Sequence, residues 1–158
     1  MMKIGIGYDV HELVENRDLI IGGVKIKHIK GLKGHSDGDV LIHAVIDAVL
    51  GALGKEDIGT LFPDSDMEYK DIDSKILLKD VYKLMEDSKF KIGNLDCVII
   101  AEKPKMRKHI SKMKSIMSEI LKTSENNINI KATTTEGLGF TGREEGIAAQ
   151  CVVLLDNK

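Results

Sequence analysis

Three residues in the first third of the chain could together bind a metal ion. Asp9 and His11 are two positions apart in an alternating apolar stretch, so on an extended strand their side chains point to the same face. His43 lies in the apolar run 40–53, which is typical of a buried helix. Two histidines and a carboxylate, with a fourth position left open, are a ligand set of catalytic zinc sites. The spacing also fits residues with a purely structural role, because Asp-x-His patterns are common.

The helix predicted over residues 40–53 carries one polar stripe. His43, Asp47 and Gly51 follow one another at intervals of four and therefore share a helix face. A buried imidazole needs hydrogen-bond partners for both ring nitrogens, because an unpaired buried polar group is costly. We therefore predict that Asp47 accepts a hydrogen bond from the ring nitrogen of His43 that does not face the metal.

Four further segments suit a phosphorylated substrate. The loop 35–39 precedes a helix and can present backbone N–H groups to phosphate. The threonines and carboxylate of 133–136 can bind phosphate oxygens and a hard cation such as magnesium. Arg143 can clamp phosphate, and the segment 101–107 is basic. Each also has a structural interpretation, as a cap, a strand or solvated charge, but together they predict a metal-dependent phosphoryl-transfer enzyme.

The elements that must position these groups follow from hydrophobic periodicity. Alternation predicts strands, and a period near 3.6 predicts helices. Asp39 is the expected N-cap of the first helix, which ends at Gly51 or Gly54. We predict an α/β (α+β) fold with a single domain over 1–158 and a mixed β-sheet packed on one face by helices. The expected strands are 3–11, 92–101, 127–135 and 147–156, with a hairpin at 19–26, a connector at 27–33, helices at 40–53, 71–88 and 105–122, and a glycine-rich loop at 137–146.

The composition limits the class of protein. The 158 residues are 42% hydrophobic and 30% charged, as in ordinary globular proteins. The net charge of −2 and the absence of tryptophan argue against a nucleic-acid binder, and no apolar run is long enough to span a membrane. Cys97 and Cys151 lie in apolar, strand-like runs that indicate buried thiols in a reducing compartment. With no targeting segment recognised, we expect a cytoplasmic protein.

A set of specific motifs extends from Ile4 to the last predicted strand. They are GYDVH, IGGV, GLKGHSDGDVLIHA, DIGTLFPDSD, EKPKM and KATTTEGLGFTGREEGIAA, in that order. On these motifs the chain resembles the 2-C-methyl-D-erythritol 2,4-cyclodiphosphate synthase family of the methylerythritol phosphate pathway to isoprenoids. The resemblance implies a cyclising phosphorus–oxygen lyase that converts 4-diphosphocytidyl-2-C-methyl-D-erythritol 2-phosphate to the cyclic diphosphate and releases CMP. It also implies a homotrimer with active sites between adjacent subunits.

The resemblance assigns roles to individual residues. Asp9, His11 and His43 match the family's zinc ligands, and Glu136 matches the ligand of a magnesium or manganese ion. His35 and Thr134 match groups that stabilise the transition state. The residues that match substrate-binding positions are Asp9, His11, His35, Ser36, Asp57, Ile58, Gly59, Phe62, Pro63, Asp64, Ser65, Asp66, Ala101, Glu102, Lys103, Pro104, Lys105, Met106, Arg107, Thr133, Thr134, Thr135, Glu136, Phe140 and Arg143.

The family resemblance further implies an apolar cavity on the threefold axis that can hold an isoprenoid diphosphate. Tyr8, Arg143 and Glu145 would line it. Two other functions remain open from the residues themselves. One is a metal-dependent phosphohydrolase. The other is an isoprenoid-diphosphate binding module with a structural zinc, which would need a fourth protein ligand, His35 or Asp39. We expect one activity, without the fused cytidylyltransferase domain of some relatives.

Overall fold

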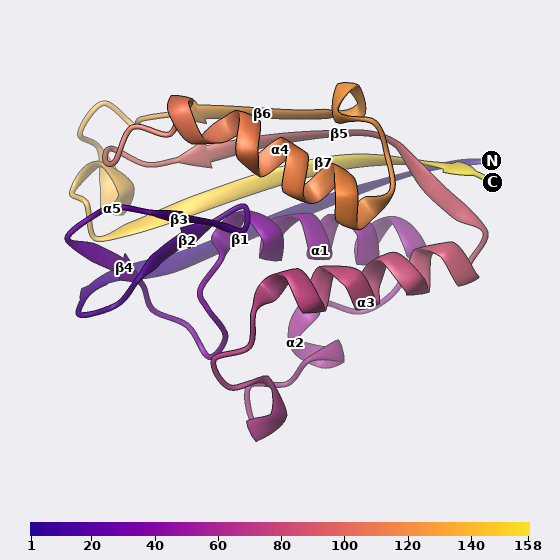
Figure 1. The fold of residues 1–158 in the computed structure, drawn as a ribbon, viewed down its shortest axis with the longest axis horizontal. Helices are drawn as coiled ribbons and strands as arrows, with labels where there is room; N and C mark the ends of the chain where they lie inside the picture. Colours follow the sequence, from indigo (N-terminus) through magenta and orange to yellow (C-terminus); the bar gives the residue numbers. More distant parts are fainter.

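A five-stranded mixed sheet forms the centre of the computed structural model, which describes all residues from 1 to 158. The strand order is β4-β1-β7-β5-β6; β5 and β6 are parallel and the other neighbours are antiparallel. The two termini lie side by side, because Met2 pairs with Asp156 (Figure 1). The strands are β1 (Met2–Glu15), β4 (Lys30–Leu32), β5 (Phe90–Ile100), β6 (Ile128–Thr133) and β7 (Gly146–Asn157), and β2 (Leu19–Ile21) and β3 (Val24–Ile26) form a separate hairpin.

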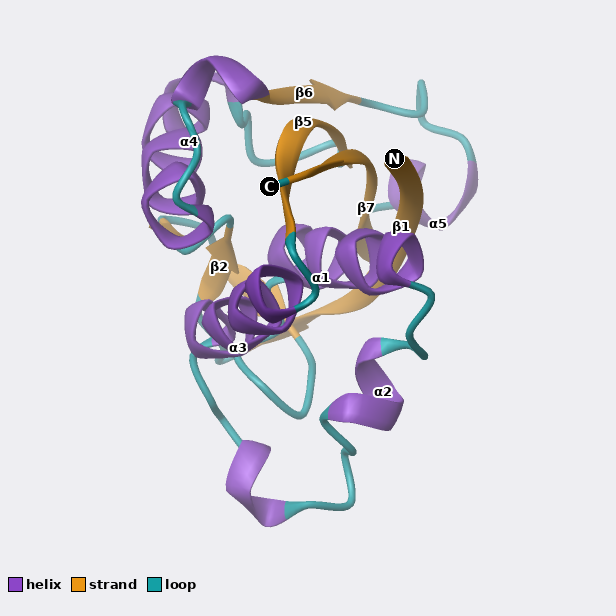
Figure 2. Cartoon of the chain, turned by 90° about the vertical axis from the view of Figure 1, so that its right-hand side faces the viewer, coloured by secondary structure: helices purple, strands orange, loops and turns teal.

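Three long helices cover one face of this sheet, as predicted (Figure 2). They are α1 (Val40–Leu53), α3 (Ser74–Asp87) and α4 (Arg107–Leu121). Helix α1 lies on β1 and β7, α3 packs on α1, and α4 packs beside β6. The other face of the sheet is bare: Ile4, Ile6 and Tyr8 of β1 are 73%, 62% and 53% exposed. None of the helices has the length and apolar character needed to cross a lipid bilayer.

The contact between β1 and α1 is unusually close, and glycines make it so. A Cβ on Gly5 would lie 1.9 Å from the carbonyl oxygen of Ala48, and one on Gly7 would lie 1.9 Å from that of Ala44. Only hydrogen can occupy these positions, so the strand backbone rests on the helix backbone. Asp9 and His11 continue the same face of β1 and therefore point toward α1.

Asp39 caps α1 and also joins it to the β2–β3 hairpin. Its carboxylate accepts the N–H groups of Ile42, Gly22 and Gly23 at 3.0, 2.9 and 2.7 Å. Burial raises the pKa of Asp39 to about 6, although these three N–H groups act in the opposite direction. At the other end the helix stops at Gly54, which adopts a left-handed φ of 69°. Gly54, rather than Gly51, is therefore the terminating glycine.

Several short elements were not predicted. Strand β4 lies in the region 27–33, which was predicted as a connector. It pairs with residues 13–15, the part of β1 that continues beyond His11. The others are two α-helices, α2 (Ile58–Leu61) and α5 (Gly139–Gly142), and two 3₁₀ turns, η1 (Met67–Tyr69) and η2 (Glu125–Asn127). Each has only three or four residues, which is too few for a periodic pattern. The loop that carries α2 and η1 projects from the body of the molecule below α1 and α3 (Figure 2).

Candidate active site

The side chains of Asp9, His11 and His43 converge where β1 meets α1. Asp9 Oδ2 lies 2.7 Å from His11 Nε2 and 3.1 Å from His43 Nδ1, and the two ring nitrogens are 3.1 Å apart. The three potential ligand atoms all lie within 4.8 Å of one another. The structure thus brings together the three residues that strand and helix spacing had singled out.

The hydrogen bonds around His11 favour a cation at this point. Its Nδ1 lies 2.6 Å from the carbonyl oxygen of Lys33, which can only accept, so Nδ1 carries a proton and Nε2 faces Asp9. Burial alone would lower the pKa of His11, but the hydrogen bond and charge of Asp9 outweigh it and raise that pKa. Burial would likewise raise the pKa of Asp9, but His11 and His43 lower it to about 2.

This donor set fits a divalent metal ion. A carboxylate oxygen and two imidazole nitrogens face a common centre. Ligands of a tetrahedral ion with bonds near 2.0–2.1 Å lie about 3.3 Å apart, slightly more open than this triangle. A small outward adjustment of the three side chains would therefore admit the ion.

The other side of His43 does not meet Asp47, so that prediction is wrong. His43 Nε2 lies 2.8 Å from Ser74 Oγ and 3.0 Å from Ser36 Oγ. Asp47 Oδ1 instead accepts a hydrogen bond of 2.8 Å from the N–H of Ile58, the first residue of α2. Asp47 lies one helical turn after His43. At that point of α1 the N–H of Ile58, which has no partner within α2 because it begins that helix, is close enough to donate to it. Its role is to hold that loop against α1.

A pocket of about 330 Å³ opens beside the three ligands. His35 borders it, and its Nε2 lies 3.1 Å from the carbonyl oxygen of Asp66. Asp57 is next to the pocket and caps α2 by accepting the N–H of Thr60 at 2.9 Å. Pro63, Ser65 and Asp66 belong to the same loop without lining the pocket. The full lining is Asp9, His11, Gly34, His35, Ser36, His43, Ile58, Gly59, Phe62, Asp64, Tyr69 and Leu77, of which Gly34, Tyr69 and Leu77 were not predicted.

The remaining predicted site residues form a second group at the carboxyl ends of β5 and β6. The N–H of Ala101 donates to Thr133 O at 3.0 Å, and the N–H of Gly137 donates to Glu102 Oε1 at 2.7 Å. Arg143 forms an exposed ion pair with Glu145. The group comprises Ala101, Glu102, Lys103, Pro104, Lys105, Met106, Arg107, Thr133, Thr134, Thr135, Glu136, Phe140 and Arg143, and none of these lines the pocket beside the ligands. Within one chain the predicted site is therefore in two parts.

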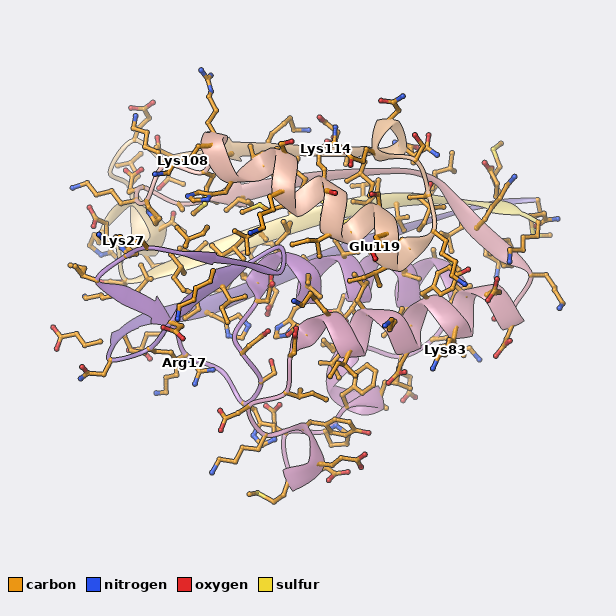
Figure 3. All side chains as sticks on the ribbon, viewed as in Figure 1. Arg17, Lys27, Lys83, Lys108, Lys114 and Glu119 are labelled. Carbon is orange, nitrogen blue, oxygen red and sulfur yellow. The ribbon has the colours of Figure 1, made fainter.

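Arg17 is an unpredicted contributor to the first part. Its guanidinium donates to Leu32 O at 2.5 Å, to Gly34 O at 3.1 Å and to Ser36 O, so it binds carbonyl groups on both sides of His35. Figure 3 shows Arg17 beside the loop that leads from β4 to α1. Its partners are backbone carbonyls 15 to 19 residues away, for which no sequence signal exists.

Known proteins resemble the chain over its whole length. The model of the YgbB family matches residues 2–156. A Bacillus cereus protein named 2-C-methyl-D-erythritol 2,4-cyclodiphosphate synthase is 60% identical over 158 residues, which are 100% of both chains. A Bacillus mycoides protein of the same name is 59% identical over the same span.

Two solved structures share the fold. The bifunctional IspDF of Campylobacter jejuni superposes with a TM-score of 0.96 at 46% identity, covering 100% of this chain and 43% of that longer one. IspF of Plasmodium falciparum, solved as a CDP complex, has a TM-score of 0.87 at 36% identity and covers 99% of this chain and 97% of its own. The fold prediction is thereby confirmed.

Proposed function

The chain belongs to the YgbB family, and from this membership we propose that it converts 4-diphosphocytidyl-2-C-methyl-D-erythritol 2-phosphate to 2-C-methyl-D-erythritol 2,4-cyclodiphosphate and CMP. The full-length relatives named for this cyclisation support the reaction. The observation that carries it in the structure is the convergence of Asp9, His11 and His43 beside a pocket of about 330 Å³.

In this reaction the nucleophile belongs to the substrate. An oxygen of the 2-phosphate attacks the β-phosphorus, a new P–O bond closes the ring, and the bond from the β-phosphorus to the bridging oxygen breaks as CMP leaves. No nucleophilic side chain is required, in keeping with a pocket lined by no cysteine. Its one serine, Ser36, lies 3.0 Å from His43 Nε2, but His43 belongs to the proposed metal ligands and is not a free base. The protein must hold two phosphates in line and neutralise their charge.

Asp9, His11 and His43 would hold zinc, and Glu136 would hold magnesium or manganese at the diphosphate. Bound metal ions supply Lewis-acid charge neutralisation at phosphate oxygens. Ser36 and Ser74 contact Nε2 of His43, so its Nδ1 faces Asp9 and His11, on the side where the metal would be held. His35 borders the pocket and would stabilise charge on the transferred group, as would Thr134 from the second group of residues.

The two parts of the site would meet across a subunit interface. The pocket lining contains no residue from 101–107 or 133–143, and in the proposed assembly a neighbouring chain would supply the cytidine-binding and Glu136 segments. The bare apolar face of the sheet, which includes Ile4, Ile6 and Tyr8, provides a surface for such neighbours. We therefore propose a homotrimer. An isoprenoid diphosphate on its axis would approach Arg143, which is exposed.

The CDP complex of the Plasmodium falciparum relative supports a cytidine-containing substrate. In this chain residues 101–107 would bind the base, largely through backbone groups. The two cysteines, Cys97 and Cys151, are buried and free although they face each other on β5 and β7, which suits the reducing cytoplasm where we expect the enzyme to act.

The direct test is product analysis with purified protein, the cytidyl substrate, zinc and magnesium. We expect CMP and the cyclic diphosphate in equal amounts, distinguished by phosphorus NMR. Release of inorganic phosphate would instead identify a phosphohydrolase. Absence of turnover with tight binding of an isoprenoid diphosphate would identify a binding module. Light scattering tests the assembly, since a stable monomer would contradict a site divided between chains.

A further inference from the structure

A buried serine connects the metal ligand His43 to a carboxylate. Ser74 is the first residue of α3 and is fully buried. Its Oγ lies 2.8 Å from His43 Nε2 and 2.5 Å from Asp37 Oδ1, while its backbone N–H donates to Asp37 Oδ2 at 3.0 Å. Asp37 Oδ1 also accepts the N–H of Asp39 at 3.1 Å. The carboxylate of Asp37 thus accepts three hydrogen bonds, two from Ser74 and one from Asp39.

This arrangement determines where the protons lie. A carboxylate only accepts hydrogen bonds, so the single hydroxyl proton of Ser74 points to Asp37. Toward His43 the same oxygen can then only accept, which requires the proton of a neutral His43 to sit on Nε2. Asp9 Oδ2 is also only an acceptor and lies 3.1 Å from Nδ1, but it already accepts from His11 Nε2 at 2.7 Å, and the contact of Ser74 Oγ with Nε2 is the shorter one, at 2.8 Å. In neutral His43 the lone pair of Nδ1 therefore faces the direction in which a metal would bind.

We propose that Ser74 and Asp37 are positioning residues for the reaction, which fix the tautomer and the ring orientation of His43 so that Nδ1 is presented to the metal. The proposal rests on the proposed function for the metal itself but concerns only residues of this chain. It replaces Asp47, which contacts α2 and not the imidazole. Partners of this kind set ligand orientation and basicity in metal sites generally.

The same unit includes the loop of His35. The N–H of Asp37 donates to Ile72 O at 3.1 Å, and the N–H of Asp71 donates to His35 O at 2.7 Å. The start of α3 and the loop before α1 therefore form one hydrogen-bonded body, although 37 residues separate Asp37 from Ser74. Orientation of the metal ligand and placement of His35 depend on the same contacts.

Ser36 is the alternative partner, and its surroundings make it the weaker one. Its Oγ lies 3.0 Å from His43 Nε2, but no carboxylate receives its proton. Its hydroxyl can rotate and serve either as donor or as acceptor, so it cannot select a tautomer. Ser36 also lines the pocket and is free to turn toward substrate.

The test compares Ser74→Ala with Ser88→Ala, a matched substitution at the other end of α3 that removes only a hydrogen bond to Leu84 O. Imidazole nitrogen shifts of the metal-free full chain at about pH 8 report the tautomer of His43. Cobalt and zinc titrations report metal affinity and, through the cobalt absorption band, ligand geometry. Asp37→Asn, which preserves volume, is the second variant in case Ser74→Ala does not fold.

We expect wild type and Ser88→Ala to show the Nε2–H tautomer and equal metal affinity. Ser74→Ala and Asp37→Asn should show mixed tautomers and weaken metal binding about 10–100-fold. An unchanged tautomer and affinity in either folded variant would overturn the proposal while leaving the metal site intact. Failure of the wild-type chain to bind zinc or cobalt would instead overturn the proposed function.

Discussion

The closeness of β1 to α1 makes Gly7 the position where one methyl group should do most harm. In Gly7→Ala the new Cβ would start 1.9 Å from Ala44 O and 2.7 Å from Ala48 N, whereas real Cβ atoms stay at least 3.0 Å away. Strand and helix must separate by about 1 Å, and overpacking of this kind costs about 1–3 kcal/mol. For a chain of this size that corresponds to a melting temperature about 2–12 °C lower.

The same displacement reaches the metal site, because Asp9 is only two residues further along β1 while His43 is on α1. Metal–ligand distances tolerate about 0.2 Å, well below the expected shift, so zinc affinity should fall as well. Calorimetric melting with and without chelator, together with zinc titration, measures both effects. Gly51→Ala is the control: its Cβ meets only Ile6 O, at 3.7 Å, and alanine in a helix is favoured by about 1 kcal/mol.

Gly51→Ala should therefore melt at or above the wild-type temperature and bind zinc normally. If Gly7→Ala behaved in the same way, the claim that the glycine contact sets the geometry of the site would be refuted. A Gly7→Ala variant that is less stable but keeps full zinc affinity would show that the strand can move without disturbing Asp9, which also contradicts the reasoning.

Four further outcomes follow from the same contacts. His43→Ala should abolish stoichiometric zinc binding, measured by metal analysis after dialysis. Asp47→Ala should keep zinc affinity but raise KM several-fold, because it releases Ile58 and the pocket loop. A loss of zinc binding in this variant would instead support the predicted contact of Asp47 with His43. Zinc affinity should decline as pH falls below the pKa of His11, raised above its ordinary 6.5, since the metal displaces that proton. In metal-free protein Asp9, with a pKa lowered from 3.8 to about 2, stabilises the fold above pH 3.8 and loses that contribution as the pH falls toward 2, which acid denaturation curves of Asp9→Asn would test.

Local patterns were sufficient for the main elements and for the shared face of Asp9 and His11, whereas His43, 32 to 34 positions away, was joined to them mainly by the family motifs. The period of two in a strand places Asp9 and His11 on one face, and the apolar run 40–53 predicts the helix with the bounds that the structure gives. Asp39 followed from cap chemistry alone. These inferences succeed because each depends on neighbours within one turn or one strand.

Contacts between distant segments were beyond the sequence. Ser74 and Arg17 act through residues 15 to 37 positions away, and several of their partners are backbone atoms that carry no side-chain identity. The prediction for Asp47 was wrong for a related reason. The spacing of four places Asp47 on the same helix face as His43, but it does not exclude a donor from another element, here the N–H of Ile58, that lies closer to its carboxylate. The division of the site into two groups is likewise a tertiary fact, because motif order along the chain gives no distance in space.

The central claim is that Asp9, His11 and His43 form the metal centre of this enzyme, and anomalous diffraction tests it most directly. Crystals grown with zinc and measured on both sides of the zinc absorption edge should give one strong peak per chain, within bonding distance of Asp9 Oδ2, His11 Nε2 and His43 Nδ1. A strong peak bound elsewhere, or the absence of a peak between these three atoms, would contradict the account.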